Sequence, residues 1–167
     1  MSGVKMTTQQ KSSVKFESAV SDLLAGDKLS NILEFYSFLK ENKLSVTLTA
    51  TNSWTVKYKG KRVCYFRVSS GYWFISYFKR SGEMFERSES YITTELKDFI
   101  HNNIKTDLGC SGCVGDGRKV ILGKEYDTVC WCHPIWLNNP DGEVLRFAKE
   151  LVLIGKNIVA DMIESGA

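Results

Sequence analysis

The chain has 167 residues, of which 43% are hydrophobic and 25% charged, so it has the size and composition of one domain with a core of its own. Its uncharged apolar runs are much shorter than the ~20 residues of a membrane-spanning helix, and no apolar segment follows the first lysines. The net charge of +3 is too small to indicate an anionic partner unless the basic residues cluster.

The N-terminal part predicts an arm followed by helices. Residues 1–15 are polar and have no periodicity, so we expect a flexible arm ahead of a single domain over 16–167. Apolar residues at helical spacing then predict a short helix that ends near Gly26, where glycine can adopt a left-handed conformation. Asp27 or Ser30 can cap a second helix, whose apolar stripe comprises Leu29, Ile32, Leu33, Tyr36 and Leu39.

Residues 46–79 are rich in aromatic and basic side chains and contain no Asp or Glu. Apolar residues alternate here with the period of a strand, between Thr-Asn, Lys-Gly-Lys and Ser-Ser-Gly sequences that favour tight turns. The last strands of this segment are apolar on both sides, so we expect them to be central, with helices on one sheet face and an aromatic surface on the other. The predicted strands of this antiparallel β-meander are 46–50, 53–59, 61–68 and 72–79.

The second half of the chain predicts further helices and short strands. Helical periodicity resumes over 90–104, and short strands are predicted at Lys119–Leu122 and Thr128–Cys132. The Asn-Pro sequence at 139–140 is a strong helix start and predicts a long C-terminal helix that ends near Glu164. Together these elements predict an α+β fold, in which an antiparallel β-meander has helices packed mainly on one face and ends in that long helix.

A cysteine-rich segment over 109–133 carries the strongest chemical motif. Cys110 and Cys113 form a Cys-x-x-Cys sequence among glycines, which resembles a zinc knuckle, and Cys130 and Cys132 follow at a separation typical of the second half of such a site. The chain has 5 cysteines and no export signal, which favours thiols or metal ligands in a reducing compartment over a disulfide framework. We therefore predict a structural zinc site in a cytoplasmic protein that has no membrane partner.

The second cysteine pair constrains how such a site can form. In an extended strand the side chains of Cys130 and Cys132 point to opposite faces. Either the backbone turns at this point, or one sulfur joins the site and His133 or His101 completes it. The alternatives are that the cysteines are buried thiols without metal, or that the Cys-x-x-Cys pair is a redox couple.

Motifs for catalysis are absent from the sequence. There is no Walker loop, dinucleotide fingerprint or nucleophile elbow. If the protein is an enzyme, its catalytic residues therefore lie in the cysteine segment. It would be either a thiol oxidoreductase using Cys110 and Cys113 or a metal-dependent enzyme whose site keeps an open position for water. A small-molecule pocket between the sheet and the C-terminal helix is a further alternative, since pockets leave no periodic signature in a sequence.

The basic aromatic sheet is the better functional indication. Single-stranded nucleic acids are bound by aromatic rings that stack on bases and by Lys or Arg near the phosphates. Packing alone also favours aromatic residues in central strands, and that is the competing interpretation. We expect a non-enzymatic binding module for nucleic acid or a protein partner, with a surface made of Trp54, Lys57, Tyr58, Lys59, Lys61, Arg62, Tyr65, Arg67, Trp73 and Tyr77.

Three sequence patterns in the meander carry a family resemblance: Trp-x-Val-x-Tyr-x-Gly-Lys from Trp54, Cys-Tyr-Phe from Cys64 and Tyr-Trp-Phe from Tyr72. Through these patterns, residues 28–80 resemble small uncharacterised bacterial proteins of the YjbR or CyaY-like double-wing type. The resemblance implies an α+β fold and, by analogy, DNA or partner binding. It does not extend to the cysteine segment and transfers no catalytic residue.

Overall fold

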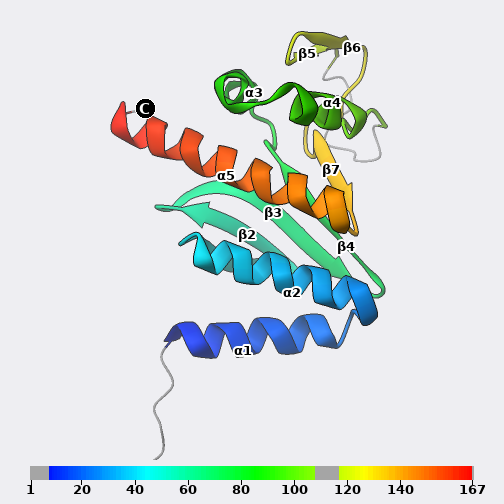
Figure 1. Ribbon diagram of the computed structural model, residues 1–167, viewed down its shortest axis with the longest axis vertical. Helices are drawn as coiled ribbons and strands as arrows, with labels where there is room; N and C mark the ends of the chain where they lie inside the picture. The colour runs from blue at the N-terminus through cyan, green and yellow to red at the C-terminus, as the bar shows by residue number, and fades with distance from the viewer. Residues whose placement is uncertain (1–7, 108–116, 167) are drawn as a thin grey trace, which may run out of the picture.

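The computed structural model describes residues 8–107 and 117–166. The fold is α+β, as predicted, and its main element is a 5-stranded antiparallel sheet with the strand order β1-β2-β3-β4-β7 (Figure 1). A separate two-stranded ribbon pairs β5 with β6. The elements in chain order are α1 (Thr8–Ser21), α2 (Gly26–Glu41), β1 (Ser45–Ala50), β2 (Ser53–Tyr58), β3 (Lys61–Ser69), β4 (Tyr72–Tyr77), α3 (Gly82–Ser88), a 3-10 turn (Glu89–Tyr91), α4 (Thr94–Asn102), β5 (Lys119–Ile121), β6 (Lys124–Tyr126), β7 (Ile135–Asn138) and α5 (Gly142–Glu164).

The predicted β-meander is confirmed, because β1 to β4 pair consecutively and antiparallel. The turn between β2 and β3 has positive φ at both Lys59 (46°) and Gly60 (82°), which is the signature of the hairpin turn whose twist matches the strands. Gly71 likewise has a positive φ of 76° before β4. The turn residues that the sequence placed between the strands therefore close the hairpins.

Strand β7 was not predicted. It pairs antiparallel with β4, through Ile75 with Leu137 and Tyr77 with Ile135, and it completes the sheet from a distant part of the chain. Its few residues give too short an alternation to recognise. The expected strand over 128–132 is wrong: the ribbon strand β6 ends at Tyr126 instead.

The start of the last helix also differs from the prediction. Asn139 does not cap α5; its backbone N–H donates to the carbonyl of Trp73 at 2.7 Å, and its Oδ1 accepts from the Trp73 N–H at 3.0 Å. The residue therefore prolongs the pairing of β7 with β4. The cap position falls to Asp141, and α5 begins at Gly142.

The N-terminal helices are longer than predicted. Helix α1 begins at Thr8, so it includes part of the segment expected to be a flexible arm, of which residues 1–7 lie outside the described part. Helix α3 was not predicted, since it is only 7 residues long, and it is capped by the Oγ of Ser81, which accepts from the Met84 N–H at 3.2 Å. Among the described residues, no helix is long and apolar enough to span a bilayer.

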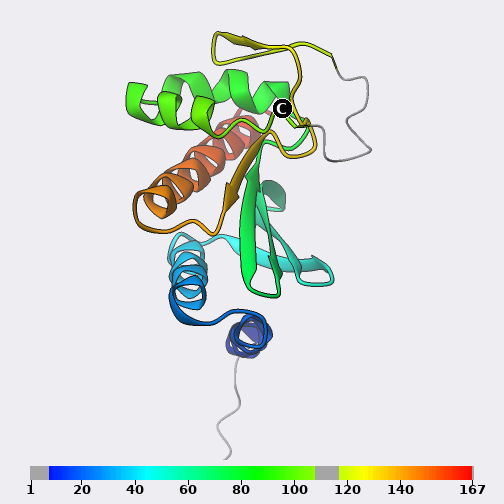
Figure 2. The same ribbon diagram turned by 90° about the vertical axis from the view of Figure 1, so that its right-hand side faces the viewer.

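Helices α2 and α5 pack on one face of the sheet (Figure 2). The ring of Phe35 on α2 lies 6.0 Å from Phe66 and 5.9 Å from Trp73, and the Tyr77 hydroxyl donates to the Ala148 carbonyl of α5 at 2.6 Å. These strand residues alternate with outward-facing ones, as side chains on a strand must. The strand residues buried on this helix-covered face are Trp54, Val56, Cys64, Phe66, Val68, Trp73, Ile75, Tyr77, Ile135 and Leu137.

A close helix–strand contact sets the distance between α5 and β3. A Cβ atom added at Gly155 would lie 2.9 Å from Cγ1 of Val63 and 3.6 Å from its carbonyl oxygen. Val63 sits at a β-bulge, because Val56 pairs with Cys64 while Lys57 pairs with Arg62. Glycine in the middle of α5 thus has a structural reason, which outweighs its poor helix propensity.

We expect Gly155→Ala to destabilise the fold. Alanine gains about 1 kcal/mol of helix propensity, but overpacking against Val63 removes about 1–3 kcal/mol. Denaturant unfolding should therefore show that Gly155→Ala lowers the free energy of unfolding. In a double-mutant cycle, Gly155→Ala should lower it less in a Val63→Ala background than in the unaltered protein. Asn157→Ala, at an exposed position of the same helix, is the control and should not destabilise. Additive effects of the Gly155 and Val63 changes would contradict the contact.

Candidate functional site

The candidate site lies on the other face of the main sheet, which none of the described helices covers (Figure 2). We call it the open face. Because strand side chains alternate, the register that buries Trp73, Ile75 and Tyr77 under the helices directs their neighbours to this side. The open-face strand residues are Ser45, Thr47, Ser53, Thr55, Lys57, Arg62, Tyr65, Arg67, Ser69, Tyr72, Phe74, Ser76, Trp136 and Asn138.

Aromatic rings from neighbouring strands meet at the centre of the open face. Phe74 of β4 stacks on Trp136 of β7 with centroids 3.6 Å apart, and it lies 5.9 Å from Tyr65 and 6.2 Å from Tyr72. His133, just before β7, stands edge-on to Trp136 at 5.0 Å. We call these five residues the aromatic cluster. Phe74 is buried beneath the others, whereas Tyr65, Tyr72, His133 and Trp136 keep exposed surface.

Polar contacts fix the orientation of these rings. The Tyr65 hydroxyl donates to Ser53 Oγ at 3.2 Å, and the Trp136 Nε1–H donates to Asn138 Oδ1 at 2.7 Å. His133 Nδ1 lies 3.1 Å from the Oγ of buried Ser76. The cluster therefore presents ring surfaces in set positions, so that little side-chain entropy is lost when a planar ligand stacks on them.

Basic residues border the aromatic cluster. None of the strands of the main sheet contains an Asp or Glu, while the open face carries Lys57, Arg62 and Arg67. Lys79 follows β4, and the Lys105 Nζ lies 4.3 Å from the Trp136 ring centroid. The open face is thus cationic as well as aromatic.

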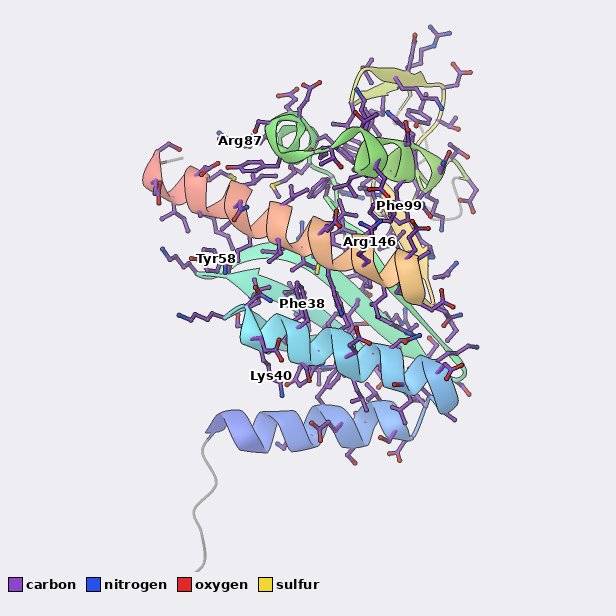
Figure 3. The ribbon with its side chains drawn as sticks, in the orientation of Figure 1. Phe38, Lys40, Tyr58, Arg87, Phe99 and Arg146 are labelled. Atoms are coloured by element: carbon purple, nitrogen blue, oxygen red, sulfur yellow. The ribbon has the colours of Figure 1, made fainter. Side chains whose placement is uncertain are left out.

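Several acidic residues of the helices form ion pairs, whereas Asp107 lies near the open face, where it lines a shallow hollow with Trp136 and Asn138. Arg146 of α5 contacts Glu95 at 3.0 Å and Glu150 at 2.8 Å (Figure 3), and Lys149 of α5 pairs with Glu34 of α2. Such exposed pairs contribute little to stability, about 0–1 kcal/mol each. Their consequence here is electrostatic, since they offset the positive charges of Arg146 and Lys149 on α5.

His133 reports the charge at the open face. Burial, which is the largest cause, and the positive charges of Lys79 and Lys105 together lower its pKa from 6.5 to about 4. The imidazole is therefore neutral at pH 7. The contribution of Lys79 and Lys105 to this shift shows that their positive charges lie close to the His133 ring.

The predicted surface residues divide between the faces of the sheet. Lys57, Arg62, Tyr65 and Arg67 lie together on the open face, as expected. Lys59 lies in the exposed β2–β3 turn, and Lys61 at the exposed start of β3.

The remaining aromatic residues of the predicted surface need correction. Trp54, Trp73 and Tyr77 are buried under the helices, because they share the strand parity that packs on α2 and α5. Tyr58 is half-buried on that same side (Figure 3), where the Lys156 Nζ of α5 lies 5.1 Å from its ring centroid. These residues stabilise the core and do not contribute to an exposed aromatic surface.

Sequence reasoning missed most of the aromatic cluster. Tyr72 and Phe74 alternate with Trp73 and Ile75 in a strand that is apolar on both sides, so the sequence could not tell which set the helices cover. Trp136 lies on the unpredicted strand β7. The usable signal was the absence of acidic residues from the meander, a feature that the short strand β7 shares.

The predicted zinc ligands are only partly described. Cys110 and Cys113 lie outside the described residues, while Cys130 and Cys132 are buried at 0% and 8% exposure. Cys130–His133 is a turn, closed by the His133 N–H donating to the Cys130 carbonyl at 2.9 Å, and not the strand expected. In a turn the two sulfurs do not have to point to opposite faces, as the expected strand would require. Within the described ranges, no three His, Cys, Asp or Glu residues gather as metal ligands.

The other histidine and the fifth cysteine lie elsewhere. His101 Nδ1 is 2.8 Å from the hydroxyl of Tyr126 on the β5–β6 ribbon. Cys64 lies in the sheet core, and burial raises its pKa, so its thiol stays protonated.

Comparisons of the chain with protein-family models, with curated proteins and with solved structures found no match. The resemblance of residues 28–80 to double-wing proteins therefore stays a prediction. Function is therefore inferred from the geometry of the site.

We expect His133 to titrate near pH 4 in the folded protein, as measured by NMR of its ring protons. The unfolded chain binds this proton at the ordinary pKa of 6.5, so the free energy of unfolding should fall as the pH decreases from about 6.5 to about 4. His133→Gln should remove this part of the pH dependence, whereas His101→Gln should leave it in place. A His133 midpoint at or above 6.5 would show that the ring is neither buried nor in a positive field.

Proposed function

We propose that this protein is a non-enzymatic binding module for single-stranded nucleic acid, which it contacts through the open face. The observation that supports this most is the placement of fixed aromatic rings among basic side chains on a sheet without acidic residues. Stacking on aromatic side chains contributes about 1–3 kcal/mol per base, and basic residues near the rings contact the phosphates. Tyr65, Tyr72 and Trp136 would supply the stacking surfaces.

A protein partner is the second candidate for the same surface, because Trp, Tyr and Arg also dominate protein interfaces. Nucleic acid is favoured by the charge pattern. Lysine is depleted in protein interfaces, yet Lys57, Lys79 and Lys105 all border the open face. A cationic surface is also better matched by the repeating negative charges of a phosphate backbone than by the mixed charges of a protein surface.

The zinc site at Cys110, Cys113, Cys130 and Cys132 is the second part of the proposal. Two observations support this site: the turn at Cys130, and the hydrogen bonds that hold this turn beside the residues just before the undescribed segment. The Cys130 N–H donates to the Lys105 carbonyl at 2.7 Å, and Thr128 Oγ1 donates to the Thr106 carbonyl at 3.0 Å. Cys110 follows Asp107 by three residues, a reach of roughly 10 Å. The thiol oxidoreductase and metal-dependent enzyme alternatives depend on Cys110 and Cys113, outside the described residues.

Binding should depend on salt and on the open-face cations. Changing Lys57, Arg62 and Arg67 together to Ala should weaken retention of single-stranded DNA or RNA, because phosphate contacts are lost. The slope of log affinity against log salt should decrease by about 2, since each phosphate contact on a single strand contributes about 0.7. Fluorescence anisotropy of a labelled oligonucleotide across a salt series measures both quantities.

The matched control removes the same net charge from the helical side. Lys40, Lys149 and Lys156 lie on α2 and α5, and their joint change to Ala should leave affinity and salt slope unchanged. Trp136→Leu should weaken binding without altering the slope, because it removes stacking and not charge. Equal losses of affinity in the two triple variants would show non-specific attraction. If the unaltered protein binds no nucleic acid, the protein partner becomes the favoured candidate.

Metal analysis tests the zinc proposal. Protein purified without chelator should contain about one zinc per chain, which is lost in Cys130→Ser and in Cys110→Ser because each removes a thiolate ligand. Cys64→Ala is the control and should retain the metal, since Cys64 lies in the sheet core. Metal-free protein with a reversible Cys110–Cys113 disulfide would instead favour the redox alternative.

A further inference from the structure

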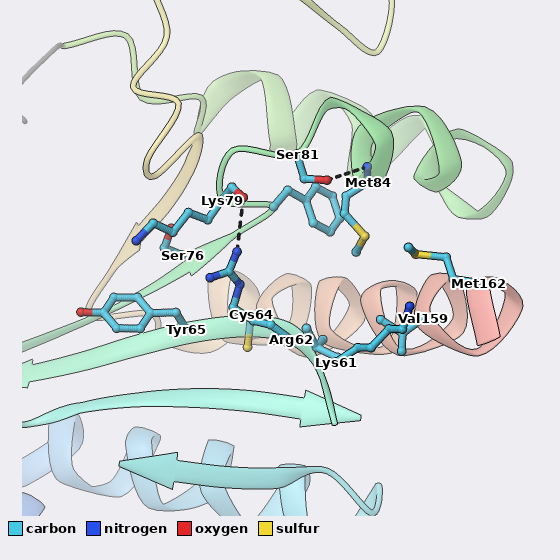
Figure 4. A pocket seen from close by; sticks show the side chains of 12 residues that line it. Lys61, Arg62, Cys64, Tyr65, Ser76, Lys79, Ser81, Met84, Val159 and Met162 are labelled. Carbon is cyan, nitrogen blue, oxygen red and sulfur yellow. Dashed lines mark hydrogen bonds between the residues drawn. The ribbon is translucent and has the colours of Figure 1, made fainter. Parts of the chain in front are cut away.

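A pocket lies where β3 and β4 separate. Strand β3 begins at Lys61, but its pairing with β4 begins only at Cys64, opposite Tyr77. Beyond Tyr77 the chain leaves the sheet through positive φ values at Phe78 (55°) and Arg80 (52°) and enters α3. The start of β3 is therefore left facing a gap, which α3 and α5 close from the far side (Figure 4).

The pocket combines apolar and cationic side chains, and among the latter Lys61 extends toward Val159 (Figure 4). Met84 of α3 and Val159 and Met162 of α5 line it on one side (Figure 4). Arg62 and Lys79 stand at its other side, joined by a hydrogen bond of 3.5 Å from the Arg62 guanidinium to the Lys79 carbonyl. A ligand that matches both halves has a compact apolar end and an adjacent negative charge.

The size of the pocket restricts that apolar end. Its volume is about 180 Å³. Drug-sized ligands occupy pockets of ~300–1,000 Å³, whereas an engineered cavity of ~150 Å³ in another protein holds benzene. The pocket is therefore large enough for one ring and too small for a whole cofactor.

The nearby carboxylates leave the cationic border available. Glu83 of α3 is paired with Arg87 at 2.8 Å, and Asp161 of α5 accepts a hydrogen bond from the Tyr91 hydroxyl. Neither interaction involves Arg62 or Lys79. An anion at the mouth of the pocket would thus meet positive charge that these acids do not already pair with.

The pocket is continuous with the open face. Tyr65 and Ser76 line the pocket and also belong to the open face, and Arg62 is common to both. A strand of nucleic acid that stacks on Tyr65 would pass the mouth of the pocket with its next unit. A ring beside a phosphate is the repeating unit of such a strand.

We propose that the pocket binds one unstacked base of a bound single strand, between Met84, Val159 and Met162, while Arg62 and Lys79 contact the adjacent phosphate. This inference rests on the proposed function and adds a position at which the base is enclosed and not merely stacked. The Ser81 hydroxyl, whose oxygen accepts from the Met84 N–H, can still donate its proton to the edge of the base.

The methionine methyl groups make the test local. In NMR spectra with labelled methionine, a short oligodeoxythymidine should shift the methyl signals of Met84 and Met162, and deoxyribose 5-phosphate should not. Shifts of the Trp136 indole signal without methionine shifts would overturn the pocket and leave the open-face proposal standing. No shift at either position would overturn both. Equal methionine shifts with the sugar phosphate would reduce the pocket to an anion site and overturn its role for a base.

Filling the pocket provides the second measurement. Met162→Trp should weaken oligodeoxythymidine binding about 5-fold or more, as for the loss of one base contact, without changing the salt slope. Leu153→Trp on the same helix lies outside the pocket lining and should bind normally. Unaltered affinity in a folded Met162→Trp protein would overturn the proposal.

Discussion

The packing of α5 across the meander is the contact on which the rest of this structure depends. Gly155 lets the helix approach Val63 closely, and the Tyr77 hydroxyl bonds to the Ala148 carbonyl beneath it. This packing decides which set of alternating strand residues is buried. Once Trp73 and Tyr77 belong to the core, the register sends Tyr65, Phe74 and Trp136 to the opposite face, so helix packing on one side determines the functional chemistry on the other.

Charge follows the same division. Arg146 and Lys149 of α5 are paired with acids, whereas the strands of the main sheet contain basic residues and no acids. The depressed pKa of His133 is a local consequence, caused by burial and by Lys79 and Lys105. A sheet face that only needed to be soluble would have no reason to avoid carboxylates. The segregation agrees with the proposed attraction to a ligand that carries repeated negative charge.

The sequence predicted the meander well, because Lys59-Gly60 and Ser70-Gly71 are local turn signals and the period of two is regular. It could not assign the faces of β3 and β4, because both sides of these strands are apolar and the choice depends on α5, far away in the chain. The Asn-Pro sequence at 139–140 predicts a helix cap from local signals alone. The actual partner of Asn139 is Trp73, a contact that only the closed sheet creates.

The cysteine turn connects the two parts of the proposed function. The His133 N–H donates to the Cys130 carbonyl and closes the turn, while the His133 ring belongs to the aromatic cluster and contacts Ser76 Oγ. A metal held by Cys130 and Cys132 would therefore stiffen the segment that leads directly into β7 and Trp136. Such a site would act structurally, by fixing one border of the binding surface. Its ligands need no open coordination position, which agrees with a closed zinc site better than with a catalytic one.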